Sequence, residues 1–204
     1  MKKLAIIFCL LMSWAQTGIS ADAAAGKTMS LVCSACHGAD GNSMVPTFPK
    51  LAGQGEVYLL KQMQDIRDGA RPVPTMAGQL DGKSDEDLAN IAAYYASLEI
   101  SRGKTDPELL ELGQKIFRAG IAMRQIPACS ACHSPTGQGN APAGFPALAG
   151  QHAEYTVAQL EMYRKGYDDE SGRTNDDGRI MRVISFGLSD KEIKAVSSYI
   201  AGLQ

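Results

Sequence analysis

The sequence is poor in features that would each indicate a definite class of protein. It has no excess of basic residues, since 20 Lys and Arg stand against 22 Asp and Glu, a formal charge of −2. Binding to nucleic acid needs a basic surface, so this balance argues against that class. Beyond the first residues, no apolar run is long enough to span a bilayer. We therefore expect a globular protein with no nucleic-acid partner and no transmembrane segment in the mature chain.

Cysteine, histidine and tryptophan are also scarce, with five, three and one residue in a chain of 204. Most of the Cys and His residues nevertheless fall into two copies of one pentapeptide, Cys-Ser-Ala-Cys-His. The first copy covers residues 33–37 and the second covers residues 129–133. This concentration of rare, metal-ligating side chains is the strongest functional signal in the sequence.

The N-terminus has the layout of a secretory signal peptide. Two lysines precede an apolar run at 4–14, and small and polar residues follow. The run is too short to span a bilayer. We predict a signal peptide at 1–20, and cleavage after Ser20 or after Ala23 satisfies the small-residue rule equally. Loss of the two lysines leaves 18 basic against 22 acidic residues, a charge of −4.

The rest of the chain contains an internal duplication. Segments of the first half recur 96 to 105 residues later: 48–54 (FPKLAGQ) as 145–151 (FPALAGQ), 58–63 as 155–160, and 84–88 as 189–193. A period of this length indicates a duplicated domain, because solenoid repeats are much shorter. We predict domains at 21–99 and 107–204, joined by a short polar linker at 100–106.

Both halves are predicted to be helical, and the fold class is all-α. Ser84 with Asp87, and Ser189 with Glu192, form capping boxes that open helices reaching about 98 and 203. Apolar spacing predicts middle helices ending at Gly69 and near 165. Asp106 and Pro107 predict the start of a further helix through Phe117. Alternating strand patterns are not evident.

The two Cys-x-x-Cys-His motifs predict covalent attachment of haem c. Two Cys about one helical turn apart can reach the two vinyl groups of one haem, and the adjacent His can ligate its iron. The thioether residues are predicted to be Cys33, Cys36, Cys129 and Cys132, and the iron ligands include His37 and His133. Two disulfides, a structural zinc site and a thioredoxin-like redox pair are the alternatives. Zinc is disfavoured by the 92 residues between Cys36 and Cys129, and a redox pair by the lack of a preceding strand.

The sixth iron ligand is predicted from the duplication. Met76 and Met181 each lie eight residues before the Ser that opens the last helix of their half. Thioether ligation occurs in c-type cytochromes, whereas an open position invites reaction with oxygen or peroxide. His152 aligns with Gly55, so we expect it at the surface or at a haem edge. An acidic stretch lengthens the second Met loop by eight residues, and we expect its charges to be solvated.

The sequence resembles the dihaem cytochromes c4, periplasmic bacterial proteins made of two class I cytochrome c domains. The resemblance covers both Cys-Ser-Ala-Cys-His motifs, the FPxLAGQ segments, the Met loops and the capped last helices. It implies two covalently bound haems c, with His37 and Met76 on one iron and His133 and Met181 on the other. It also implies that the carbonyls of Pro49 and Pro146 accept the imidazole N–H. The run before Cys129 is longer than the run before Cys33, so the domains are not equivalent.

We therefore predict a periplasmic electron carrier and not an enzyme. Its donor would be a quinol-oxidising complex or a dehydrogenase, and the resemblance implies a terminal haem-copper oxidase as acceptor. Peripheral association with a membrane stays open. The alternatives are a dedicated haem subunit of a periplasmic dehydrogenase, and a haem peroxidase or ligand sensor. An apolar patch near the haem edges, including Val45 and Phe48, is the predicted contact surface.

Overall fold

The computed structural model describes residues 21–204, and the predicted signal peptide lies outside them. This part of the chain is helical and contains no β-strand, only isolated bridges between Ile121 and Ile126 and between Asn140 and Phe145. The prediction of an all-α fold is confirmed. Within the same residues, no helix combines the length and apolar character needed to cross a membrane.

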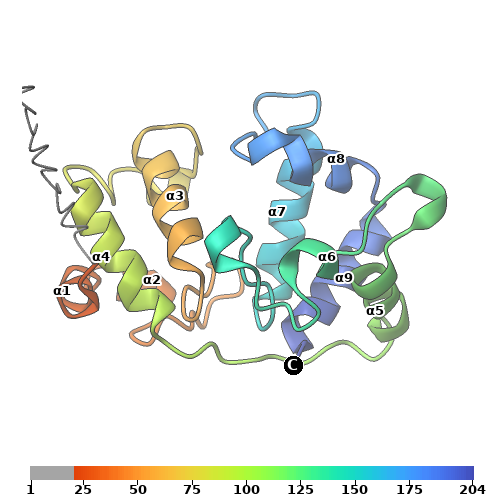
Figure 1. Ribbon diagram of the computed structural model, residues 1–204, viewed down its shortest axis with the longest axis horizontal. Helices are drawn as coiled ribbons and strands as arrows, with labels where there is room; N and C mark the ends of the chain where they lie inside the picture. Colours follow the sequence, from red (N-terminus) through yellow and green to blue (C-terminus); the bar gives the residue numbers. More distant parts are fainter. Residues whose placement is uncertain (1–20) are drawn as a thin grey trace, which may run out of the picture.

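The helices divide between two halves that lie side by side (Figure 1). The first half contains α1 (Ala23–Met29), α2 (Ser34–His37), α3 (Glu56–Arg67), the 3-10 helix η1 (Pro74–Met76) and α4 (Asp85–Ala96). The second half contains α5 (Leu110–Ala119), η2 (Ala122–Arg124), α6 (Ser130–His133), η3 (Ala141–Ala143), α7 (Ala153–Lys165), η4 (Asp177–Arg179), α8 (Ile180–Phe186) and α9 (Asp190–Gly202). Helices α3 and α7 face each other, and an extended stretch connects α4 to α5 along one edge.

The last helix of each half begins at the predicted capping box. The hydroxyl of Ser84 accepts a hydrogen bond from the Asp87 amide at 3.1 Å, and the Asp87 carboxylate accepts one from the Ser84 amide at 2.9 Å. Ser189 and Glu192 form the matching box ahead of α9. These reciprocal bonds satisfy backbone donors that a helix start otherwise leaves free.

The predicted start of α5 is wrong by one turn. Residues 107–109 form a turn, and α5 begins at Leu110 instead of at Pro107. The Asp106 carboxylate does accept a hydrogen bond from the Glu108 amide at 2.9 Å. Asp106 and Pro107 therefore stabilise the turn that precedes α5, and not the first turn of the helix itself.

Two glycines allow the first helix of each half to cross the last helix closely. A Cβ on Gly26 would lie 1.9 Å from the Asn90 carbonyl oxygen of α4. A Cβ on Gly113 would lie 2.3 Å from the Ala195 carbonyl oxygen of α9. Because the two glycines occupy matching places in the duplication, both halves use the same backbone-to-backbone crossing.

Each half has its own apolar core. Leu59, Ile91, Ala92 and Tyr95 form the cluster in the first half. The cluster in the second half is larger and includes Ile116, Phe117, Ile193, Val196 and Tyr199. A domain of this size buries little apolar surface by itself, so a prosthetic group at its centre would add much of the buried apolar surface that a stable domain needs.

Candidate functional site

The two Cys-x-x-Cys-His motifs form one-turn helices, α2 and α6. The His37 amide donates to the Cys33 carbonyl at 3.0 Å, and the His133 amide donates to the Cys129 carbonyl at 3.0 Å. One such turn brings both Cys of a motif to the same side of the helix. In the described residues none of the four forms a disulfide, and the first Cys of each pair packs against the core of its half. The geometry fits two thioether bonds to one planar group in each half.

The two motif histidines are buried and oriented alike. Nδ1 of His37 lies 2.9 Å from the Pro49 carbonyl oxygen, and Nδ1 of His133 lies 2.9 Å from the Pro146 carbonyl oxygen. Because a carbonyl only accepts, Nδ1 carries the proton and Nε2 keeps its lone pair. These are the contacts that the family resemblance implied.

Burial also favours the form of imidazole that binds a metal. It lowers the pKa of His37 and of His133, and the proline carbonyls oppose this shift only in part. Both rings are therefore neutral at pH 7 and present Nε2 as a ligand, as iron in a c-type haem requires. In residues 21–204, no three His, Cys, Asp or Glu side chains gather as a zinc site would need.

The two predicted Met ligands are both half-buried. Met76 ends η1 and lines a cavity of about 250 Å³ together with Ile66 and Val73. Met181 lies in the first turn of α8, not on a loop as predicted, and it packs on the same cluster as Cys129 and Leu148. The second half thus gathers a proposed thioether, a proposed iron ligand and a core leucine around one cluster.

Sequence reasoning missed a polar cluster between α3 and α7. Arg71 donates to Gln62 of its own half at 3.0 Å, and to Tyr155 and Gln159 of the other half at 3.1 and 2.9 Å. Arg173 makes the reciprocal set, donating to Gln159 at 2.7 Å and to Tyr58 and Gln62 at 3.2 and 2.6 Å. Tyr58 matches Tyr155 in the repeated segments, and Gln62 matches Gln159. These identical polar residues at matching positions were the sequence signal that could have indicated the cluster.

The cluster provides a test of whether haem fits here. Arg71 and Arg173 are only 9% and 5% exposed, and their guanidinium groups share the same two glutamine oxygens. Within the described chain, neither forms an ion pair with a carboxylate. Two buried cations side by side are stabilised only by nearby negative charge. Haem carries two propionates, so the residues present fit this group.

The arginines also act on the tyrosines of the cluster. Burial would raise the pKa of Tyr58, but the positive charges of Arg173 and Arg71 outweigh it and lower this pKa. Arg173 also donates to the Tyr58 hydroxyl at 3.2 Å, and this hydrogen bond lowers the pKa of the phenol further.

The FPxLAGQ motif holds the halves together through its last residue. The Gln54 amide group binds both backbone groups of Ala147, accepting from N–H at 2.7 Å and donating to C=O at 2.9 Å. Gln151 binds both backbone groups of Lys50 at 2.9 Å. Lys50 and Ala147 are the variable residues of the same motif, so each copy of the motif binds the other.

His152, expected at the surface or at a haem edge, is half-buried, and its Nε2 lies 2.7 Å from the Ser43 carbonyl oxygen of the first half. The expectation for the acidic stretch needs correction at one residue. The acidic stretch was expected to be solvated, yet the Asp176 side chain is only 5% exposed because it pairs with Arg182 at 2.5 Å. The acidic residues at 168–170 are exposed, as expected.

Comparison with known proteins agrees with this geometry. The family profile described as Cytochrome c matches residues 23–99 and again residues 110–204. The cytochrome c4 of Pseudomonas aeruginosa is 54% identical over 97% of this chain and 98% of its own length. The solved structure of reduced recombinant cytochrome c4 from Pseudomonas stutzeri superposes with a TM-score of 0.86 at 52% identity, covering 90% of this chain and all of that one.

A more distant relative carries a different description. It is a thiosulfate dehydrogenase electron acceptor from Stutzerimonas stutzeri strain A1501, 36% identical over 85% of this chain and 80% of its own length. With both halves matched and a relative of more than half identical sequence spanning nearly the whole chain, this protein belongs to the cytochrome c4 family of electron-transfer proteins and carries two covalently bound haems c.

Proposed function

We propose that this cytochrome carries electrons in the periplasm from a quinol-oxidising complex or a dehydrogenase to a terminal haem-copper oxidase. When bound, each haem iron accepts and releases one electron. The observation that carries the proposal is the matched pair of buried, neutral imidazoles, His37 and His133, each with its Nε2 free. Met76 and Met181 would supply the second protein ligand to each iron, and such ligation would close the irons to oxygen and peroxide, which suits electron transfer alone.

The first half offers a contact surface for a redox partner. Ser43 donates to the Cys36 carbonyl at 3.0 Å, which holds residues 43–45 beside the first motif. Leu31, Val32, Met44 and Val45, which we call the motif patch, are exposed by 70, 58, 93 and 45%. Phe48, also predicted to contribute, is half-buried near His37. A small apolar patch of this kind suits the brief complexes of electron-transfer proteins.

Oxidase-containing membranes provide the test. The reduced cytochrome is mixed with these membranes at increasing ionic strength, and its reoxidation is followed optically. We expect fast reoxidation that depends only weakly on salt, because the patch is apolar. Met44→Asp should slow it, whereas Met123→Asp, on an equally exposed residue of the second half, should not. Absence of reoxidation under every condition would remove the oxidase from the proposal.

A thiosulfate-oxidising dehydrogenase is a second candidate donor, favoured by the relative described as its electron acceptor. Reduction of the oxidised cytochrome by such an enzyme with thiosulfate, compared with reduction by quinol-oxidising membranes, distinguishes the two donors. A complex with the dehydrogenase that survives gel filtration would support the dedicated-subunit alternative.

The start of the mature chain is proposed at Ala21. The Asp22 carboxylate caps α1 by accepting from the Ala24 amide at 2.8 Å, and the Asp22 amide donates to Asn90 at 2.6 Å. Cleavage after Ser20 keeps both bonds, whereas cleavage after Ala23 removes them. The mass of the exported protein, measured after haem loading, should correspond to a chain that begins at Ala21.

We also propose domain limits of 21–99 and 107–204, because the chain between Ala96 and Leu110 forms no helix.

A further inference from the structure

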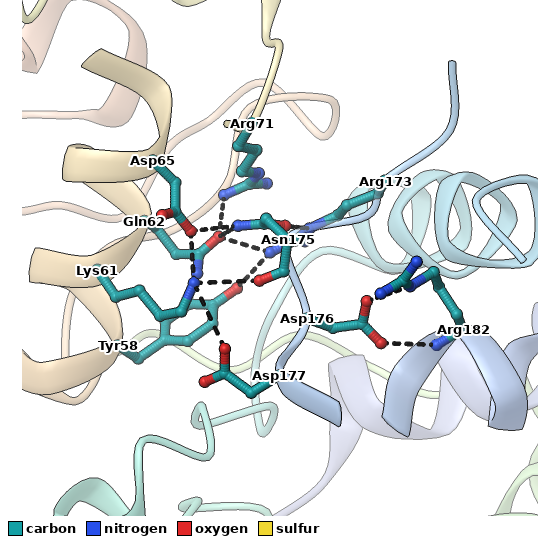
Figure 2. Close-up of polar contacts among 10 residues, drawn as sticks. All are labelled: Tyr58, Lys61, Gln62, Asp65, Arg71, Arg173, Asn175, Asp176, Asp177 and Arg182. Carbon is teal, nitrogen blue, oxygen red and sulfur yellow. Dashed lines mark hydrogen bonds and ion pairs between the residues drawn. The ribbon is translucent and has the colours of Figure 1, made fainter. Parts of the chain in front are cut away.

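The two Met loops differ in how they are anchored. Seven positions separate Gly69 from Met76, but fifteen separate Gly166 from Met181. In the first loop Arg71 donates to Tyr155 and Gln159 of the second half, but within the described chain residues 72–77, which lead on to Met76, make no hydrogen bond to that half. In the second loop Arg173 is the counterpart of Arg71, and Asn175, closer to Met181, makes additional contacts with α3 (Figure 2).

The crossing is centred on Asn175. Its side-chain amide donates to the Asp65 carboxylate at 2.6 Å and to the side-chain oxygen Oε1 of Gln62 at 3.0 Å. Its backbone carbonyl accepts from the Lys61 ammonium at 3.1 Å, and Lys61 also pairs with Asp65 at 2.6 Å. Three residues of α3 thus hold both the side chain and the main chain of Asn175, as Figure 2 shows.

The next residue connects this contact to the proposed iron ligand. One oxygen of Asp176 accepts from Arg182 Nε at 2.5 Å, and the other accepts from the Arg182 backbone amide at 3.0 Å. That amide belongs to the peptide bond that joins Met181 to Arg182. The Asp176 side chain is 5% exposed and that of Arg182 is 15% exposed, so the pair is shielded from solvent.

We propose that residues 172–177 form a strap through which the first domain positions the Met ligand of the second haem. Lys61 and Asp65, which lie in the first half, are positioning residues for Met181. The strap lets the first domain restrain the loop that would have to move for Met181 to leave the iron. This inference rests on the proposed ligation by Met181.

The test measures how easily an external ligand displaces Met181. All variants are made in haem-loaded full-length protein carrying Met76→His, so that the far-red sulfur-to-iron absorption reports on the second haem alone. Imidazole is added to the oxidised protein, and loss of this absorption gives its affinity. Lys61→Met and Asn175→Ala should each bind imidazole about tenfold more tightly, the equivalent of one lost hydrogen bond to a charged group.

Controls separate the strap from general effects. Lys27→Met removes the same charge from an exposed position on α1 and should leave the affinity unchanged. Lys61→Arg keeps a donor and should restore most of the restraint. The reduction potential of the second haem should fall in the loosened variants, since weaker Met ligation favours the oxidised state.

Unchanged imidazole affinity in both Lys61→Met and Asn175→Ala, with a normal thermal unfolding midpoint, would overturn the strap. An equal increase in Lys27→Met would also overturn it, because charge alone would then explain the effect. Met181→Ala in the same background tests the ligand separately: if the far-red absorption persists, the ligand assignment fails whatever the strap variants do.

Discussion

At the scale of single residues, the orientation of two imidazoles defines the chemistry. A carbonyl at Pro49 or Pro146 fixes the proton on Nδ1, so that Nε2 is the atom left for iron. The sequence predicts the two histidines because their motif is local. It also predicts Met76 and Met181, but only because the duplication selects one pair from the nine methionines.

The methionine ligands can be tested one at a time. Met76→Ala and Met181→Ala should each remove about half of the far-red sulfur-to-iron absorption of the oxidised protein, since each would free one of two irons. The potential of the affected haem should fall, because loss of the thioether favours the oxidised state. Met162→Ala, at a partly exposed position on α7, should leave the spectrum intact. An unchanged spectrum in both ligand variants would refute the assignment.

The buried arginines show where prediction from the sequence ends. Charged side chains are normally exposed, so nothing local marks Arg71 and Arg173 as interior residues. Their position depends on the contact between α3 and α7, and on a charged prosthetic group that is not part of the amino-acid sequence. The interface glutamines were missed for the same reason, because their partners lie 93 to 101 residues away.

At the scale of helices, local signals predicted most of the structure. Capping boxes and apolar spacing placed α3, α4, α7 and α9. The seven-residue helix α1 has a weaker pattern and depends on Asp22, which caps it and contacts Asn90 of α4. Helix α8 was missed because η4 and α8 follow each other across a left-handed Arg179, a bend that has no sequence signature.

The close crossings of α1 with α4 and of α5 with α9 depend on Gly26 and Gly113, where a Cβ would overlap the backbone of the other helix. Gly26→Ala and Gly113→Ala should each destabilise the protein by about 3 kcal/mol, because the new methyl group overlaps a backbone carbonyl that cannot move independently. Chemical denaturation of the haem-loaded protein measures the change. Gly82→Ala is a useful comparison, since a Cβ there meets nothing within 4 Å and the cost is limited to its left-handed backbone. Equal losses in all three variants would show that contact at the crossing is not the cause.

The capping box of α9 should make stability depend on pH. Partial burial raises the pKa of Glu192, but hydrogen bonds from Arg124 and Ser189 outweigh this effect and lower the pKa below its ordinary value of 4.5. As the pH falls, Glu192 is therefore protonated in the unfolded chain before it is protonated in the folded protein. The stabilisation present above pH 4.5 is lost as the pH falls through the pKa of Glu192 in the folded protein. Glu192→Gln, which keeps the cap, should remove about 1 kcal/mol at pH 7 and flatten this acid dependence.

Denaturation midpoints measured from pH 3 to pH 7 would test this expectation. Glu161→Gln, at an exposed position on α7, should retain the acid dependence of the parent protein. If Glu192→Gln retains it too, other carboxylates are responsible.

At the scale of the whole molecule, hydrogen bonds from side chains of each half to the other join the two halves. Gln54→Ala or Gln151→Ala would leave a backbone N–H and C=O of the other half without partners. Each should cost about 1–3 kcal/mol and make the linker at 100–106 easier for a protease to cleave. Gln79→Ala, at an exposed position, should do neither. Unaltered proteolysis in both interface variants would mean that other contacts hold the halves together.

The reciprocal glutamine contacts have the pattern of a two-fold symmetric dimer, in which one patch binds its own copy. Here both copies belong to one chain, so their encounter does not depend on protein concentration. A short connection raises the effective concentration of one half near the other to about the millimolar range. Contacts that two separate proteins would form only at high concentration can therefore persist within this one chain, which keeps the two electron-carrying centres paired at any dilution.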